Sequence, residues 1–147
     1  MNDKVLKELN KELEGVIMGE NQIMKLLEKA KDFKVIEFLN NTLKIAEKNK
    51  LAIIEEIKSL GGKPTNDEGT WGKIVEVFNS IKEMNIDTDK EILQTGIKGT
   101  EMGFKAILDF LIKETDLNEA FKKDLINISD EYSKIIKEMQ EYLIQLN

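Results

Sequence analysis

The chain has 147 residues, 41% hydrophobic and 34% charged with one proline, and this balance fits one domain, residues 1–147, built from long amphipathic helices. Its net charge of −6, with lysines and acids interspersed, disfavours a protein that binds nucleic-acid phosphates and leaves no polybasic anchor for a membrane surface. Cysteine and histidine are both absent, which excludes disulfides, thiolate chemistry and imidazole as a metal ligand or general base.

The first predicted helix covers about residues 3–30. Apolar side chains recur there every three or four residues, a spacing that places them on one helix face. Glu20 is the only member of this face that is not apolar. A short connection at Lys31 and Asp32 follows, so the first two helices should be antiparallel neighbours, with the Asp32 carboxylate capping the second helix.

The second predicted helix carries an apolar stripe over residues 36–60. Lys50 is the one cation in the middle of this stripe. Gly61 and Gly62 should end the helix, because glycine adopts the left-handed C-terminal conformation without a Cβ penalty. Pro64 lies just beyond and prevents the helix from resuming.

Residues 61–88 form a connection much longer than a tight hairpin needs. It could carry the chain along the bundle, as a single long crossover does in ferritin-like folds. Within it, apolar spacing predicts a short extra helix over residues 71–84, capped by Thr70. Trp71, at its start, is expected to pack across the bundle ends.

The third long helix is predicted from about residue 89 to residue 114. Thr88 and Glu91 have the capping-box spacing that marks a helix start. Gly96, Gly99 and Gly103 lie close to one side of this helix, where each costs about 1 kcal/mol relative to alanine. We interpret them as positions of close backbone packing, with a hinge or the approach of a ligand as the alternative.

The last long helix is predicted over about residues 117–146, with Asp116 as its acidic cap. Its apolar seam includes Tyr132 and Tyr142, whose rings should pack in the core or at the bundle end while their hydroxyls reach a partner. Four long helices, each about 40 Å at 1.5 Å per residue, predict an all-α four-helix bundle with a long crossover.

Three stretches resemble a known family. They are residues 9–24 around Gly19 and Glu20, residues 59–64 with the Leu-Gly-Gly-Lys-Pro turn followed by Gly69 and residues 71–72, and residues 98–101. In these the chain is similar to small ferritin-like four-helix-bundle proteins of bacteria, which are classed as a domain of unknown function and are often found near stress genes. The resemblance implies a ferritin-like bundle and self-association, and it supplies no activity.

A carboxylate metal site is one hypothesis for the interior. Ferritin-like di-metal proteins use a glutamate from each of two helices and Glu-x-x-His from each of the other two. Here lysine stands in both histidine positions, and a protonated lysine cannot ligate a metal. A divergent metal-binding or oxidase site would therefore use only carboxylates. These are Glu20, Glu47, Glu101 and Glu131.

A metal-free internal charge cluster is the second hypothesis, in which lysine replaces the charge of a metal. Solvated side chains are the third, because Glu-x-x-Lys pairs are ordinary on helix surfaces. Folding the second helix back about residues 31–32 also leaves Glu20 and Lys50 offset by about 10 Å along the bundle. The cluster would comprise Glu20, Lys50, Glu101, Glu131 and Lys134.

These patterns favour a non-enzymatic helical bundle with a structural or interaction role, needing no cofactor. We expect a cytoplasmic protein, because the N-terminus lacks a signal-peptide core and no apolar run approaches the ~20 residues of a membrane span. A homo-oligomer is expected from the family resemblance. A further hypothesis is a pocket in the bundle core for a small apolar ligand.

Overall fold

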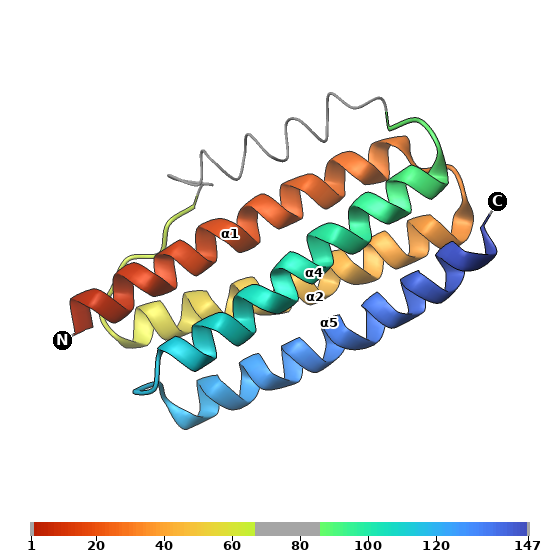
Figure 1. The fold of residues 1–147 in the computed structure, drawn as a ribbon. Helices are drawn as coiled ribbons and strands as arrows, with labels where there is room; N and C mark the ends of the chain where they lie inside the picture. The colour runs from red at the N-terminus through yellow and green to blue at the C-terminus, as the bar shows by residue number, and fades with distance from the viewer. Residues whose placement is uncertain (1, 67–85, 147) are drawn as a thin grey trace.

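The computed structural model describes residues 2–66 and 86–146 of the chain, and Figure 1 shows their arrangement. This part is an all-α bundle of four helices without strands. None of these helices has an apolar run suited to crossing a membrane. The helices are α1 (Asn2–Lys29), α2 (Phe33–Ser59), α4 (Asp89–Lys113) and α5 (Glu119–Gln145).

The long connection links opposite ends of the bundle. After α2, Gly62 packs against Leu6 near the start of α1. Before α4 begins, the chain has reached the other end, where the Asp89 carboxylate accepts a hydrogen bond of 2.8 Å from the backbone N–H of Lys31. Therefore α2 and α4 run in the same direction, and the prediction of a crossover along the bundle is confirmed by its described ends (Figure 1). The predicted short helix at 71–84, with Trp71, lies outside the described residues.

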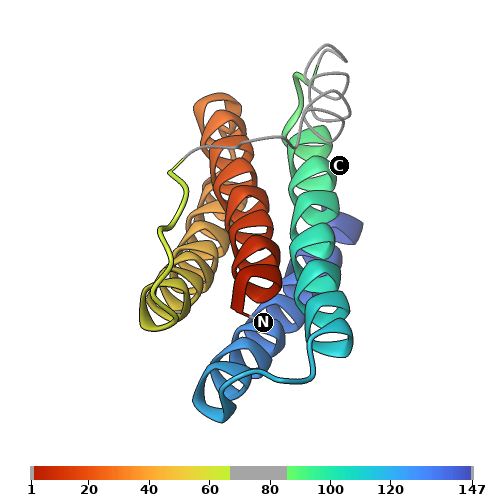
Figure 2. The same cartoon turned by 90° about the vertical axis from the view of Figure 1, so that its left-hand side faces the viewer.

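Each helix packs against two main neighbours. Helix α1 lies between α2 and α4, and α5 lies between the same two helices on the opposite side. In Figure 2, α2 and α4 flank α1 on its two sides and α5 lies behind it. The interior is therefore shared by all four helices, and residues from three or four of them can meet at one point.

The helix ends largely follow the predicted capping residues. Asp32 caps α2 by accepting from the N–H of Lys34, and Thr88 and Glu91 form the complete capping box of α4. Gly61 has φ of 80°, the left-handed conformation expected after α2. The prediction for α5 was wrong by about two residues. The N-cap of α5 is Asn118 and not Asp116, and the Asn118 side chain accepts a hydrogen bond of 2.8 Å from the backbone N–H of Ala120.

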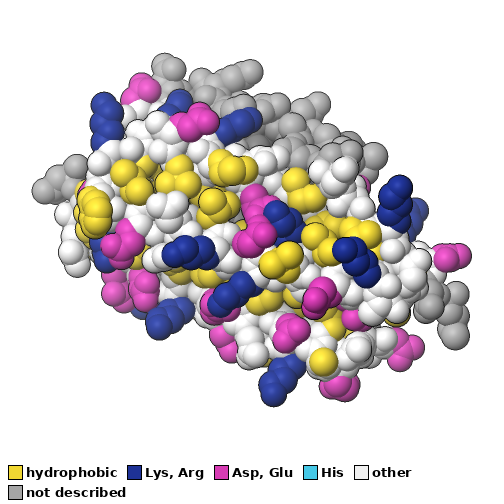
Figure 3. Space-filling view, turned by 180° about the vertical axis from the view of Figure 1, so that it is seen from behind, with side chains coloured by type: hydrophobic (Ala, Val, Ile, Leu, Met, Phe, Trp, Pro, Cys, Tyr) yellow, Lys and Arg dark blue, Asp and Glu magenta, His cyan; other side chains and the backbone are white. Residues whose placement is uncertain are grey.

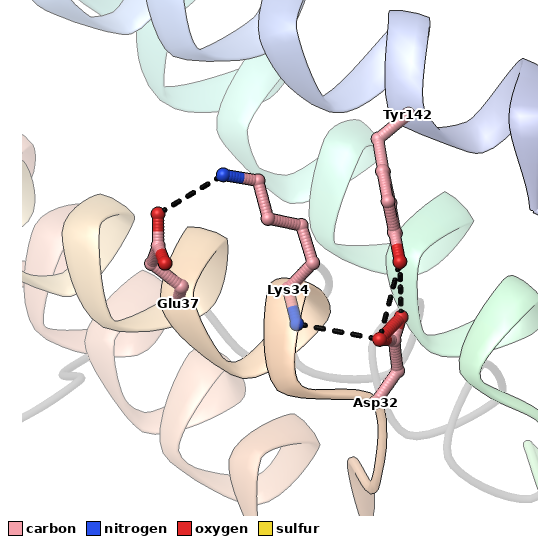
Figure 4. A network of polar contacts seen from close by, with 4 residues as sticks. All are labelled: Asp32, Lys34, Glu37 and Tyr142. Atoms are coloured by element: carbon pink, nitrogen blue, oxygen red, sulfur yellow. Dashed lines mark hydrogen bonds and ion pairs between the residues drawn. The ribbon is translucent and has the colours of Figure 1, made fainter.

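A polar contact joins α5 to the start of α2 (Figure 4). The hydroxyl of Tyr142 donates to the Asp32 carboxylate, 2.6 Å from Oδ2, and this bond raises the pKa of Tyr142. The Tyr142 ring also packs against Phe38, with centroids 5.7 Å apart. Nearby, Lys34 forms an exposed ion pair with Glu37. The expectation that Tyr142 packs at the bundle end with a partnered hydroxyl is confirmed.

The two ends of the core are filled by large apolar side chains. Near the start of α1, Phe110 and Phe121 meet edge to face with centroids 6.4 Å apart, and the void among their neighbours is only about 10 Å³. At the other end Leu39 and Leu93 are fully buried. The middle of the bundle is built differently, because smaller and more polar side chains line it.

Candidate functional site

The structure brings together three of the charged residues singled out in the sequence. Lys50 Nζ lies 3.0 Å from Oε1 of Glu20 on α1 and 2.9 Å from Oε2 of Glu47 on its own helix. The expected offset of about 10 Å does not keep Glu20 and Lys50 apart. The two long side chains reach each other across the α1–α2 contact.

Burial and pairing set the charges of this cluster. Burial raises the pKa of Glu20, although its hydrogen bond with Lys50 acts in the opposite direction. The hydrogen bond to Lys50 lowers the pKa of Glu47, and the same bond raises the pKa of Lys50. Lys50 is thus held as a cation between two carboxyl groups, of which Glu20 is the buried one.

The cluster lies beside a groove between α1 and α2 rather than in the sealed core. Ile17, Met24, Leu43 and Ile54 share the lining of this groove with the three charged residues. Figure 3 shows the side of the molecule opposite to that seen in Figure 1, where acidic and basic side chains meet among hydrophobic ones. The arrangement is therefore an ion cluster at the edge of the bundle.

The other predicted cluster members do not join this group. Glu131 on α5 pairs with Lys48 at 2.8 Å on the surface. Glu101 is exposed and lines a separate groove with Gln140 of α5, and Lys134 is exposed as well. The sequence could not show this, because helical spacing alone does not fix the rotation of each helix.

The four glutamates do not fit a di-metal centre. Across residues 2–66 and 86–146, no group of three or more acidic side chains is placed to hold a metal ion. Glu20 and Glu47 both bind Lys50, and Glu131 binds Lys48. The donor set that the carboxylate hypothesis requires is therefore dispersed over three places, which are the Lys50 cluster, the Lys48–Glu131 pair and the exposed position of Glu101.

A cavity of about 120 Å³ lies in the middle of the bundle, mainly between α1 and α4. The two helices run side by side in both ribbon views (Figures 1 and 2). Thr42 and Asn49 of α2 and Tyr132 of α5 also reach its wall. Six residues of the wall along the α1–α4 contact have little or no side chain. These are Gly15, Gly19, Gly96, Gly99, Gly103 and Ala106.

The three glycines of α4 contribute in different ways. A Cβ on Gly96 would lie 3.0 Å from Leu39, and one on Gly103 would lie 3.6 Å from the Tyr132 ring, so close packing is confirmed at both. A Cβ on Gly99 would meet no described side chain within 4 Å. At Gly99 the described residues therefore show no close packing, and the space beside this glycine is open.

Asn49 contributes to the wall a buried polar atom that lacks a partner in the described part of the chain. Its side chain is only 2% exposed, and within the described chain Oδ1 has no hydrogen bond. The side chain does hydrogen-bond Tyr132, which opposes the effect of burial on that hydroxyl. Burial is stronger and raises the pKa of Tyr132 to about 12, so the hydroxyl stays protonated.

The sequence pattern did not identify Asn49, because the buried face of α2 is centred elsewhere than predicted. Lys50 was assigned to the stripe, but it is half-buried, whereas Thr42 and Asn49 are fully buried. Thr42 tolerates burial because its hydroxyl donates to the carbonyl oxygen of Phe38 at 2.9 Å. A second stripe at the same spacing through residues 35, 39, 42, 46, 49 and 53 was the available signal.

Glu12 lies on the cavity wall near the apolar end of the core. Burial, together with the nearby charges of Glu8 and Asp109, raises its pKa to about 7. Lys11 and Lys113 oppose this shift, but Lys113 also pairs with Glu8 at 3.2 Å. The carboxyl group of Glu12 therefore changes its charge near neutral pH.

One family model matches the chain, over residues 4–113. The chain belongs to the family described as Domain of unknown function (DUF2383). No curated protein and no solved structure matches it. The DUF2383 match ends at the last residue of α4, so it includes Asn49 and the small residues of the cavity wall, whereas Tyr132 of α5 lies beyond it.

Proposed function

We propose that this chain is a non-enzymatic, ferritin-like helical bundle that works by binding, and that the cavity between α1 and α4 holds a small, mainly apolar molecule. The observation that carries the proposal is the cavity itself, about 120 Å³ in volume, where the ends of the same core are closely filled. Protein interiors contain few voids larger than a water molecule, so an unfilled middle is unusual.

The size of the cavity defines the size of the molecule. An engineered apolar cavity of about 150 Å³ in another protein stays dry and binds benzene. The volume of this one is similar, and apolar side chains such as Val16, Ile23 and Leu26 share its lining with the glycines. A single aromatic ring or a short aliphatic chain therefore matches the space.

Metal binding is the weaker alternative. It would need Glu20, Glu47, Glu101 and Glu131 to converge, and Lys50 already binds the first two. Self-association and a cytoplasmic location stay predictions, and light scattering after size-exclusion chromatography tests the first. A monomer at working concentration would remove the homo-oligomer from the account.

Titration with toluene, followed by calorimetry or by amide NMR shifts, tests the proposed function. We expect a Kd on the order of 0.1–1 mM, which is typical of an efficient ligand with seven heavy atoms. Gly99→Leu should remain folded, since open space receives the new side chain, and should lose toluene binding. The matched control Gly99→Ala adds one carbon and should retain it. Absence of toluene binding to the wild-type protein would overturn the proposal.

A further inference from the structure

The Oδ1 atom of Asn49 makes the cavity chemically asymmetric. Asn49 is only 2% exposed and lines the cavity, and no hydrogen bond to its Oδ1 atom is found among the described residues. A buried acceptor without a donor is costly, and natural cores contain few such groups. The atom therefore marks a point where a bound molecule gains more than apolar contact.

The three threonines of the wall do not supply the missing donor, and neither Gln22 nor Tyr132, whose side chains carry donor groups, hydrogen-bonds Oδ1 of Asn49. Thr42, Thr95 and Thr100 each donate their hydroxyl hydrogen to a carbonyl of their own helix, at distances between 2.7 and 2.9 Å. What these hydroxyls still offer the cavity is lone pairs. The threonine hydroxyl oxygens and Oδ1 of Asn49 can therefore accept hydrogen bonds from a molecule in the cavity.

We infer that the molecule held in the cavity carries one uncharged hydroxyl or N–H group, which donates to Oδ1 of Asn49. The inference rests on the proposed function and specifies the chemistry of its ligand. A simple phenol or a short alcohol has the required form, an apolar body with one donor. A charged ligand does not, because ions are strongly penalised in a mainly apolar cavity.

Phenol and toluene are a matched pair for the test, because a hydroxyl in one replaces a methyl group in the other. Their affinities are measured by calorimetry for the wild-type protein and for Asn49→Leu, which keeps a similar volume without Oδ1. The measured quantity is the phenol-to-toluene affinity ratio, compared between the wild-type protein and the variant. The cost of dehydrating each ligand is the same for both proteins, so it cancels in this comparison. We expect the preference for phenol over toluene to fall about tenfold in Asn49→Leu.

Thr42→Val is the control, since it removes a hydroxyl from the same helix and the same wall whose hydrogen is already donated to Phe38. Its preference should stay within about twofold of the wild-type value. If toluene and phenol bind and Asn49→Leu changes their ratio less than twofold, the inference fails while the proposed function stands. If neither ligand binds the wild-type protein, both fail. A circular dichroism spectrum establishes that each variant is folded.

Discussion

The ends and the middle of this bundle are built from different residues, although the same four helices form both. At the end near the start of α1, Leu9, Phe110, Phe121 and Leu125 leave a void of only about 10 Å³. In the middle, glycines and threonines leave about 120 Å³. The end near the start of α1 is therefore more closely packed than the middle, where we propose that a ligand binds.

The largest expected effect comes from opening one of the filled ends. Leu9 is fully buried and lines the small void at the end near the start of α1, so Leu9→Ala removes well-packed methyl groups and should lower the free energy of unfolding by about 2–5 kcal/mol. Urea denaturation measures the change. Leu51→Ala is the control, because Leu51 is 52% exposed, and it should change little. A loss below about 1 kcal/mol for Leu9→Ala would contradict a closely packed end.

Removing Lys50 should have the next largest effect, because it leaves the buried Glu20 without its cation. Lys50→Met should cost about 2–3 kcal/mol at pH 8. Since burial raises the pKa of Glu20, protonation relieves the cost, which should be smaller at pH 5. Lys48→Met removes an exposed ion pair with Glu131 and should cost under about 1 kcal/mol. Equal costs for the two variants would show that the cluster is only a surface contact.

Glu12 predicts a pH-dependent difference. Its folded pKa of about 7 lies above the ordinary 4.5, so the folded state binds more protons between these values and its stability falls as the pH rises through them. Glu12→Gln removes this fall and should raise stability at pH 8 by about 1–3 kcal/mol, with little effect below pH 4.5. The charged groups that face Glu12 are Glu8, Lys11, Asp109 and Lys113.

Denaturation curves at pH 4.5 and pH 8 provide the comparison for Glu12. The control is Glu55→Gln, an exposed glutamate whose replacement should behave alike at both values. A gain for Glu12→Gln that does not depend on pH would show that the carboxyl group is not the cause.

The smallest expected effect distinguishes two glycines one turn apart. Gly99→Ala gains helix propensity and meets open space, so it should stabilise the protein by about 0.5–1 kcal/mol. Gly96→Ala gains the same propensity, but its Cβ would lie 3.0 Å from Leu39, so the gain should be lost. Thermal unfolding of both variants checks this, and a gain at Gly96 equal to that at Gly99 would argue against close packing there.

Local chemistry made most of the fold predictable from the sequence. Helical spacing located the four helices, Thr88 and Asp32 marked two helix starts, and the length of residues 61–88 predicted a crossover. The predicted start of α5 was wrong because Asp116 and Asn118 are both residues that favour the N-cap position. In the structure Leu117 is buried before the helix, and Asn118 is the cap.

The candidate site was less predictable, because it depends on how the helices rotate against one another. Apolar content placed Lys50 on the buried face of α2, whereas packing buries Asn49 beside it. The three glycines of α4 look alike in the sequence, and only the neighbours Leu39 and Tyr132 distinguish them. A void cannot be inferred from spacing, since it is defined by the side chains that fail to fill it.

The central claim is that the middle of the bundle, and not its ends, receives the ligand. Amide NMR shifts measured during a phenol titration test this most directly. We expect the largest shifts at Gly15, Gly19, Gly99 and Gly103, which line the cavity, and little change at Leu9. Shifts confined to surface residues or to the filled ends, or none at saturating phenol, would contradict it.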